Sequence, residues 1–272
     1  MPIDTSSYYP EVNDPDGNNG DSLNNRHSSL FGDKPKEEII EVVLEEENNR
    51  QPGEPRYEEP QAQPEGWEKP LTLFCNFLSW VLVPLLMPVF GTIFIFRLSI
   101  LDVVPSGLQT AFIFIILGLN FVLPVLLVLL LKFLGLVDDI GLNGQKERLI
   151  PYMITVLCMG GSAWFMATRG APIWVCMFFA GGAAAGLINL LINLKWKISA
   201  HAAGIAGVIA LLIRLQKDVA AEPQLFVWLL ITVGAAGLLG SARVWLQRHT
   251  VWQVLAGYVV GFCSVFFMMS IH

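Results

Sequence analysis

The chain has 272 residues, of which 54% are hydrophobic, and a mean hydropathy of +0.55, so it is too apolar for an ordinary soluble domain of this length. The formal net charge of −6 is segregated: residues 1–70 carry 17 acidic and 6 basic side chains, and residues 71–272 carry 6 acidic and 11 basic ones. We therefore predict an acidic tail over residues 1–70 and a helical membrane domain over residues 71–272, with no nucleic acid partner.

The tail is rich in Pro, Asn, Glu, Asp and Gly and cannot bury enough apolar surface to offset the entropy of ordering, which predicts disorder. One segment, residues 36–47, has enough helix formers for a short amphipathic helix. A transient helix in a solvated tail is favoured over a docking motif. No secretory signal is expected, because the first apolar run comes late and lacks a basic leader.

Long apolar runs follow residue 70, each close to the ~20 residues that cross hydrocarbon. Helices are expected, since open strands would leave backbone groups unpaired in lipid. The fold class predicted is all-α, a multi-pass transmembrane bundle of about seven spans. The fifth span is short for a crossing. The spans are 74–97, 108–134, 150–168, 172–194, 201–216, 224–242 and 252–270.

Several residues within these runs are expected to serve packing alone. Pro84 and Pro88 should kink the first span. The small residues of 181–186 and 202–207 should let neighbouring helices approach closely. No cysteine has the spacing of a metal site, and all are expected to pack as small hydrophobic side chains; they are Cys75, Cys158, Cys176 and Cys263. No metal and no cofactor is expected.

Counting crossings places three polar connections, 135–149, 195–200 and 243–251, on one face of the membrane. His201 and His249 both lie at this face. Cations and a hydroxyl around helix starts favour a phosphate ligand, because guanidinium groups pair with its oxygens and helix N-termini add amide donors. The candidate phosphate-binding residues are Lys146, Arg148, Lys197, Ser199 and Arg243.

Two imidazoles beside a phosphate can divide the work of phosphoryl transfer, one attacking phosphorus and the other protonating the leaving oxygen. The pairs Ser199-x-His201 and Arg243-x5-His249 resemble the second and third signature segments of the type-2 phosphatidic acid phosphatase superfamily, and Lys146 with Arg148 resembles a compressed first segment. The stretch from Pro84 to Pro88 is similar to a feature of a Bacteroidetes branch of that family.

The resemblance implies a metal-independent phosphatase of lipid phosphates or polyprenyl (pyro)phosphates. It implies that His249 is the nucleophile, that His201 is the general acid, and that Lys146, Arg148, Ser199 and Arg243 bind phosphate. The motifs are degenerate: Ile198, Ala200 and Ala242 replace family residues, and Gln253 stands where an aspartate would hold His249. A glutamine carbonyl can orient the ring but supplies no charge, which predicts slow turnover. One of Asp138, Asp139 and Glu147 could substitute.

Two alternatives stay open: a weakened relative that binds anionic lipid without turnover, and a small transporter whose path the cations line. The basic residues favour a cytoplasmic site, whereas resemblance to bacterial members favours an extracytoplasmic one in the inner membrane. Trp196, Trp245 and Trp252 are expected to be interfacial anchors.

Overall fold

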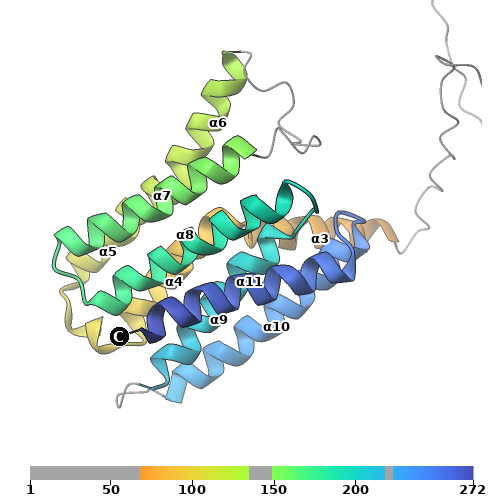
Figure 1. Ribbon diagram of the computed structural model, residues 1–272. Coiled ribbons are helices and arrows are strands. Elements are labelled where there is room, and N and C mark those ends of the chain that lie inside the picture. Colours follow the sequence, from red (N-terminus) through yellow and green to blue (C-terminus); the bar gives the residue numbers. More distant parts are fainter. Residues whose placement is uncertain (1–67, 135–148, 218–222, 272) are drawn as a thin grey trace, which may run out of the picture. The chain divides into compact units, whose positions relative to one another are not determined.

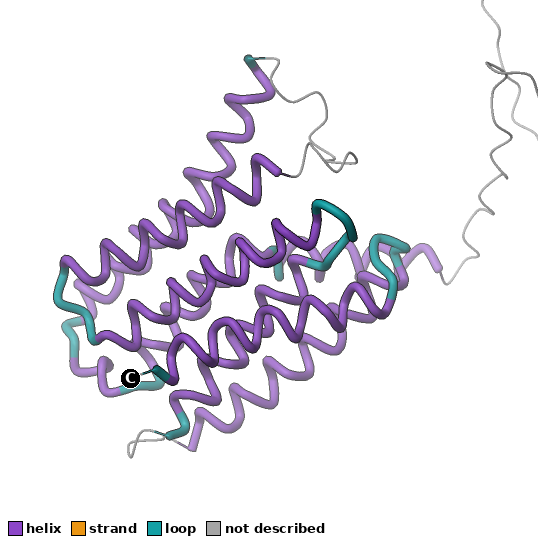
Figure 2. The backbone as a smooth tube through the Cα atoms, in the orientation of Figure 1, coloured by secondary structure: helices purple, strands orange, loops and turns teal. Residues whose placement is uncertain are grey.

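The computed structural model describes residues 68–134, 149–217 and 223–271, and all the regular structure in these ranges is helical (Figures 1 and 2). The acidic tail, its 36–47 segment and the connection that holds Lys146 and Arg148 lie outside the described residues. The elements are α3 (Glu68–Val81), η1 (Pro84–Leu86), α4 (Met87–Arg97), η2 (Ile100–Val103), α5 (Ser106–Leu117), η3 (Gly118–Val122), α6 (Leu123–Phe133), α7 (Leu149–Thr168), α8 (Ile173–Asn193), α9 (Ala200–Leu215), α10 (Pro223–Trp245) and α11 (Val251–Ser270).

Six helical stretches within the described ranges are long and apolar enough to cross a membrane. They are Glu68–Arg97, Ser106–Phe133, Leu149–Thr168, Ile173–Asn193, Gln224–Trp245 and Val251–Ser270. The chain is therefore a multi-pass membrane protein. The expected fifth span is α9, an apolar helix of 16 residues, which at 1.5 Å per residue is about 24 Å long and shorter than the ~30 Å hydrocarbon core.

Helix α9 lies at the centre of the packing. It contacts α11, α10, α4, α8 and η1, and most of its side chains are buried. Helix α8 in turn lies between α7 and α11 (Figure 1). Because neighbouring helices cover α9, its side chains contact mainly protein and only slightly the surrounding lipid.

Proline interrupts the first membrane-length stretch, as the sequence predicts. The residue before a proline is disfavoured in the helical region, and Val83 accordingly has an extended backbone (φ −63°, ψ 140°). Helix α3 therefore ends at Val81, and the chain continues through the 3₁₀ turn η1 into α4.

Helices α9 and α11 run parallel, and glycines allow their backbones to touch. A Cβ atom on Gly261 would collide with the carbonyl oxygen of Ala203, and one on Gly257 would lie 2.5 Å from that of Ser199. The pairs 199–257 and 203–261 advance together along both chains, so the two N-termini share one end of the bundle. Small residues at four-residue spacing give membrane helices this kind of close contact.

We predict that Gly261→Ala destabilises the bundle, because the added methyl group meets backbone atoms that cannot rotate away. Overpacking of this kind costs about 1–3 kcal/mol. Gly237→Ala on α10 is the matched control, since a Cβ there meets nothing within 4 Å. Thermal unfolding in detergent should show a lower midpoint for Gly261→Ala and an equal or higher one for Gly237→Ala. Equal midpoints for both variants would contradict the close contact.

Candidate active site

The end of α10 determines how Arg243 and His249 are placed. The amides of Arg248 and His249 both donate to the carbonyl of Arg243, at 3.1 and 3.3 Å, and Gln247 N donates to Val244 O at 2.9 Å. Gln247 has φ +51°, the left-handed conformation that closes this type of helix end. The turn folds His249 back over the last turn of α10, which explains the five-residue interval between the arginine and the histidine.

Helix α11 begins with a capping box that also holds His249. Gln253 N donates to Thr250 Oγ1 at 3.4 Å, and Thr250 N donates to Gln253 Oε1 at 3.2 Å. The same Oε1 lies 3.2 Å from His249 Nδ1. An amide oxygen only accepts hydrogen bonds, so the ring proton of His249 belongs on Nδ1 and Nε2 carries the lone pair.

The connection from α8 to α9 meets this turn through its backbone. Ser199 is fully buried and caps α9, its Oγ accepting from Ala202 N at 3.4 Å. Its own amide donates to the carbonyl of Gln253 at 3.2 Å. The starts of α9 and α11 are therefore joined directly, and the hydroxyl of Ser199 serves the helix cap.

His201 is oriented by the end of α3. Its Nε2 lies 3.1 Å from the carbonyl oxygen of Ser79. That carbonyl is available because Pro84 ends the helix before Val83 can donate to it. A carbonyl oxygen is an acceptor, so Nε2 of His201 is protonated in this arrangement.

After burial, the charges of Arg243 and His249 are further causes that lower the pKa of His201. The three side chains are therefore close enough for their charges to interact. Arg248 acts in the same way on Arg243. The Nε atom of Arg243 is buried and donates to no group among the described residues. The N-termini of α9 and α11 add two positive helix ends beside it. This end of the bundle is therefore suited to an anion.

The structure thus brings five of the eight predicted site residues together at one end of the bundle; they are Ser199, His201, Arg243, His249 and Gln253. Lys197 lies half-buried in the α8–α9 connection, two residues before Ser199. Lys146 and Arg148 lie outside the described residues. Arg243 was expected in a connection, but it occupies the last turn of α10, which extends three residues beyond the predicted end of that span.

Two residues of this arrangement were missed from the sequence. Ser79 contributes a backbone carbonyl, which no side-chain pattern reveals. Thr250 could have been found, because a threonine three residues before a glutamine at the start of an apolar run is the capping-box pattern. Within the described ranges, no three His, Cys, Asp or Glu side chains are grouped so as to hold a metal ion.

Comparison with known proteins gives one family. No curated protein and no solved structure matches the chain. The family model of the PAP2 superfamily matches residues 179–272, which contain most of α8 and all of α9, α10 and α11. This region, with both histidines, is therefore similar to the type-2 phosphatidic acid phosphatase superfamily.

Proposed function

We propose that the chain is a metal-independent phosphatase of lipid phosphates that works through a phosphohistidine intermediate. The observation that carries the proposal is the buried Nε–H of Arg243, which has no acceptor among the described residues and lies beside two imidazoles and two helix N-termini. A buried donor without an acceptor costs about 1–3 kcal/mol, and a phosphate oxygen would satisfy it. A bacterial inner membrane is the expected location.

His249 is the proposed nucleophile. With its proton held by Gln253 Oε1, its Nε2 lone pair attacks phosphorus, so a P–N bond forms as the P–O bond to the lipid breaks. Arg243, with Lys197, Lys146 and Arg148, would hold the phosphate oxygens and stabilise the charge that develops on them.

His201 is the proposed general acid. Burial, followed by the charge of Arg243, lowers the pKa of His201 to about 3, and a phosphate dianion beside the ring would raise it. The cationic ring would then keep one proton on Nε2, donated to Ser79 O, and deliver the other from Nδ1 to the leaving oxygen. Water then attacks the phosphohistidine, His201 takes a proton from it, and phosphate leaves with His249 restored. Each proton and each electron pair in the cycle has a donor and an acceptor.

The two alternatives fit the geometry less well. A purely lipid-binding relative is suggested by Gln253, yet its carbonyl performs the orienting task expected of the family's aspartate. A transporter needs ionisable groups along its path, and within the described ranges the basic side chains of the helices lie in their first or last turns. Lipid phosphate hydrolysis gives a role to both imidazoles, to Arg243 and to Gln253, while Ser199 caps α9 beside them.

We expect His249→Ala to lower phosphate release from phosphatidic acid or polyprenyl phosphate by at least about a thousandfold, because the nucleophile is lost. His201→Ala should lower it roughly a hundredfold or more, as for other general acids. Purified protein with labelled lipid phosphate should also yield an acid-labile phosphoprotein that is absent from His249→Ala. His27→Ala, in the tail, is the matched control. Undiminished release by His249→Ala would exclude the mechanism.

Gln253→Glu should raise kcat about fivefold. Glutamate keeps both acceptor contacts and adds a charge that stabilises the cationic ring, and a charged hydrogen bond is worth about 1 kcal/mol more than a neutral one. Gln253→Leu should lower kcat, since it removes the acceptor of His249 Nδ1 and the capping box. Steady-state kinetics on one lipid phosphate compares the three proteins. A Gln253→Glu enzyme no faster than the parent would show that this hydrogen bond does not limit the reaction.

Pro84→Ala tests whether Ser79 positions His201. A longer α3 would pair Ser79 O with Val83 N and remove the acceptor of His201 Nε2. Loss of one hydrogen bond of about 1 kcal/mol should lower kcat roughly fivefold with little change in KM, and the ¹⁵N shifts of His201 should lose the Nε2–H signature. Pro88→Ala is the control, because Pro88 lies inside α4. Unchanged ¹⁵N shifts in Pro84→Ala would refute this positioning role.

A further inference from the structure

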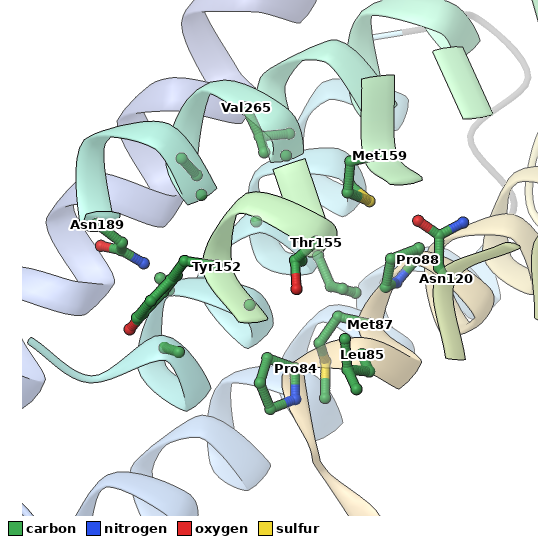
Figure 3. A pocket seen from close by; sticks show the side chains of 18 of the residues that line it. Pro84, Leu85, Met87, Pro88, Asn120, Tyr152, Thr155, Met159, Asn189 and Val265 are labelled. Carbon is green, nitrogen blue, oxygen red and sulfur yellow. The ribbon is translucent and has the colours of Figure 1, made fainter. Parts of the chain in front are cut away.

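A cavity of about 110 Å³ lies among η1, α4, α7, α8 and α9 (Figure 3). Its walls are mainly apolar, and its α9 side is formed by small residues from Ala200 to Gly207, with Val208 beyond them. Residues 200 and 208 are eight positions apart, so the cavity extends about 12 Å along the helix. Ala200 directly precedes His201, so the cavity starts beside the candidate active site.

Two interruptions of helical structure border this cavity. Pro84 and Leu85 belong to the 3₁₀ turn η1, and Asn120 belongs to the π-helical segment η3. Irregular backbone at membrane depth is tolerated where it is covered by protein or lines a cavity, and π-helical segments are frequent at functional sites. Because both interruptions line the cavity, we take the cavity to be part of the folded structure and not a packing defect.

Two asparagines at the cavity have unsatisfied acceptors. Asn120 is 2% exposed, and its Nδ2 donates to Ser162 Oγ at 2.7 Å and to Ile116 O at 3.2 Å. These bonds fix the amide, and its buried Oδ1 accepts from no group among the described residues. Asn189, 3% exposed, also has a buried Oδ1 without a donor in the described part of the chain. Both side chains line the cavity (Figure 3).

We propose that this cavity receives the chain of the lipid substrate, and that Asn120 and Asn189 select a lipid phosphate carrying hydroxyl or amide hydrogens over one with a plain alkyl or prenyl chain. The proposal rests on the proposed function, since it takes the phosphate to lie at His249. An apolar, elongated cavity accepts a hydrocarbon chain. Among lipid chains, one with N–H or O–H donors would also satisfy the two amide oxygens, whose burial without a donor is costly.

The selection separates lipid classes by chemistry. Asn189 lies four residues from the end of α8, about 6 Å along the helix, near the level expected for the first carbons after the phosphoester. Hydroxyl or amide groups on these carbons would meet it. Asn120 lies deeper and would meet a hydroxyl further along the chain. Prenyl chains carry no such donors.

The test compares octadecyl phosphate with analogues that carry one hydroxyl, either at carbon 2 or near the middle of the chain. Wild-type protein should show a KM about five- to tenfold lower for a hydroxylated analogue, with similar kcat. Asn189→Leu should abolish the preference for the carbon-2 hydroxyl. Asn120→Leu should abolish the preference for the hydroxyl near the middle of the chain. Thr232→Val on α10 is the matched control, because its hydroxyl bonds only to its own helix, at Trp228 O.

Because Asn120→Leu also removes the bond to Ser162, Ser162→Ala provides a second comparison: it breaks that bond but keeps the Asn120 carbonyl, so the preference should persist. Thermal stabilisation of His249→Ala by each lipid, measured without turnover, separates this proposal from the proposed function. Greater stabilisation by the hydroxylated lipids would support the selection even if no lipid were hydrolysed. Equal KM values and equal stabilisation for all three lipids, as expected if the asparagines bind only water, would overturn it.

Discussion

The close contact of α9 with α11 is the constraint on which the candidate active site depends. Gly257 and Gly261 remove the side chains that would separate the two helices, so the Ser199 amide can reach the Gln253 carbonyl. His201 follows one of these helix starts and His249 precedes the other, so a single helix pair fixes the relation between the two rings. Since the helices are parallel, the positive ends of both dipoles point to the same place. Separating them would weaken the anion site and misalign the imidazoles together.

The charge balance at this end of the bundle favours an anionic ligand. Within the described ranges the sequence contains two carboxylates. Asp102 lies in η2 beyond the far end of α4, and Glu68 begins α3, whose Thr72 accepts a hydrogen bond from Trp245 at the end of α10. Glu68 is outnumbered at this end of the helices by Lys195, Lys197, Arg243 and Arg248. The acceptors that orient the imidazoles are a backbone carbonyl and a glutamine oxygen, both uncharged. Neither neutralises Arg243, whose buried Nε–H has no acceptor in the described part of the chain. A phosphate dianion would supply both the missing charge and the missing acceptor.

The sequence predicted much of this arrangement because hydrophobic run length and motif spacing are local properties. Apart from the start of α3, which lies six residues before the expected one, the helices begin and end within three residues of the expected spans. The Ser199–His201 and Arg243–His249 intervals match turns that the structure contains. What could not be predicted depends on distant contacts. The carbonyl of Ser79 has no sequence signature, and whether α10 stops at residue 242 or 245 is decided by the turn at Gln247. The Oδ1 atoms of Asn120 and Asn189 have no donor among the described residues, and this too can be recognised only once the helices are packed together.

The short length of α9 bears on how the proposed lipid phosphate would reach the candidate active site. At its far end, Lys217 is exposed and Arg214 is only partly buried, and charged groups of this kind are stable at the membrane surface. If that end is held at the interface, the shortfall of about 6 Å relative to the hydrocarbon core falls at the end that carries His201. His201 then lies below the headgroup level, next to the cavity that begins at Ala200. A lipid phosphate would reach the imidazoles by a small movement along its own axis, with its chain remaining in an apolar environment throughout.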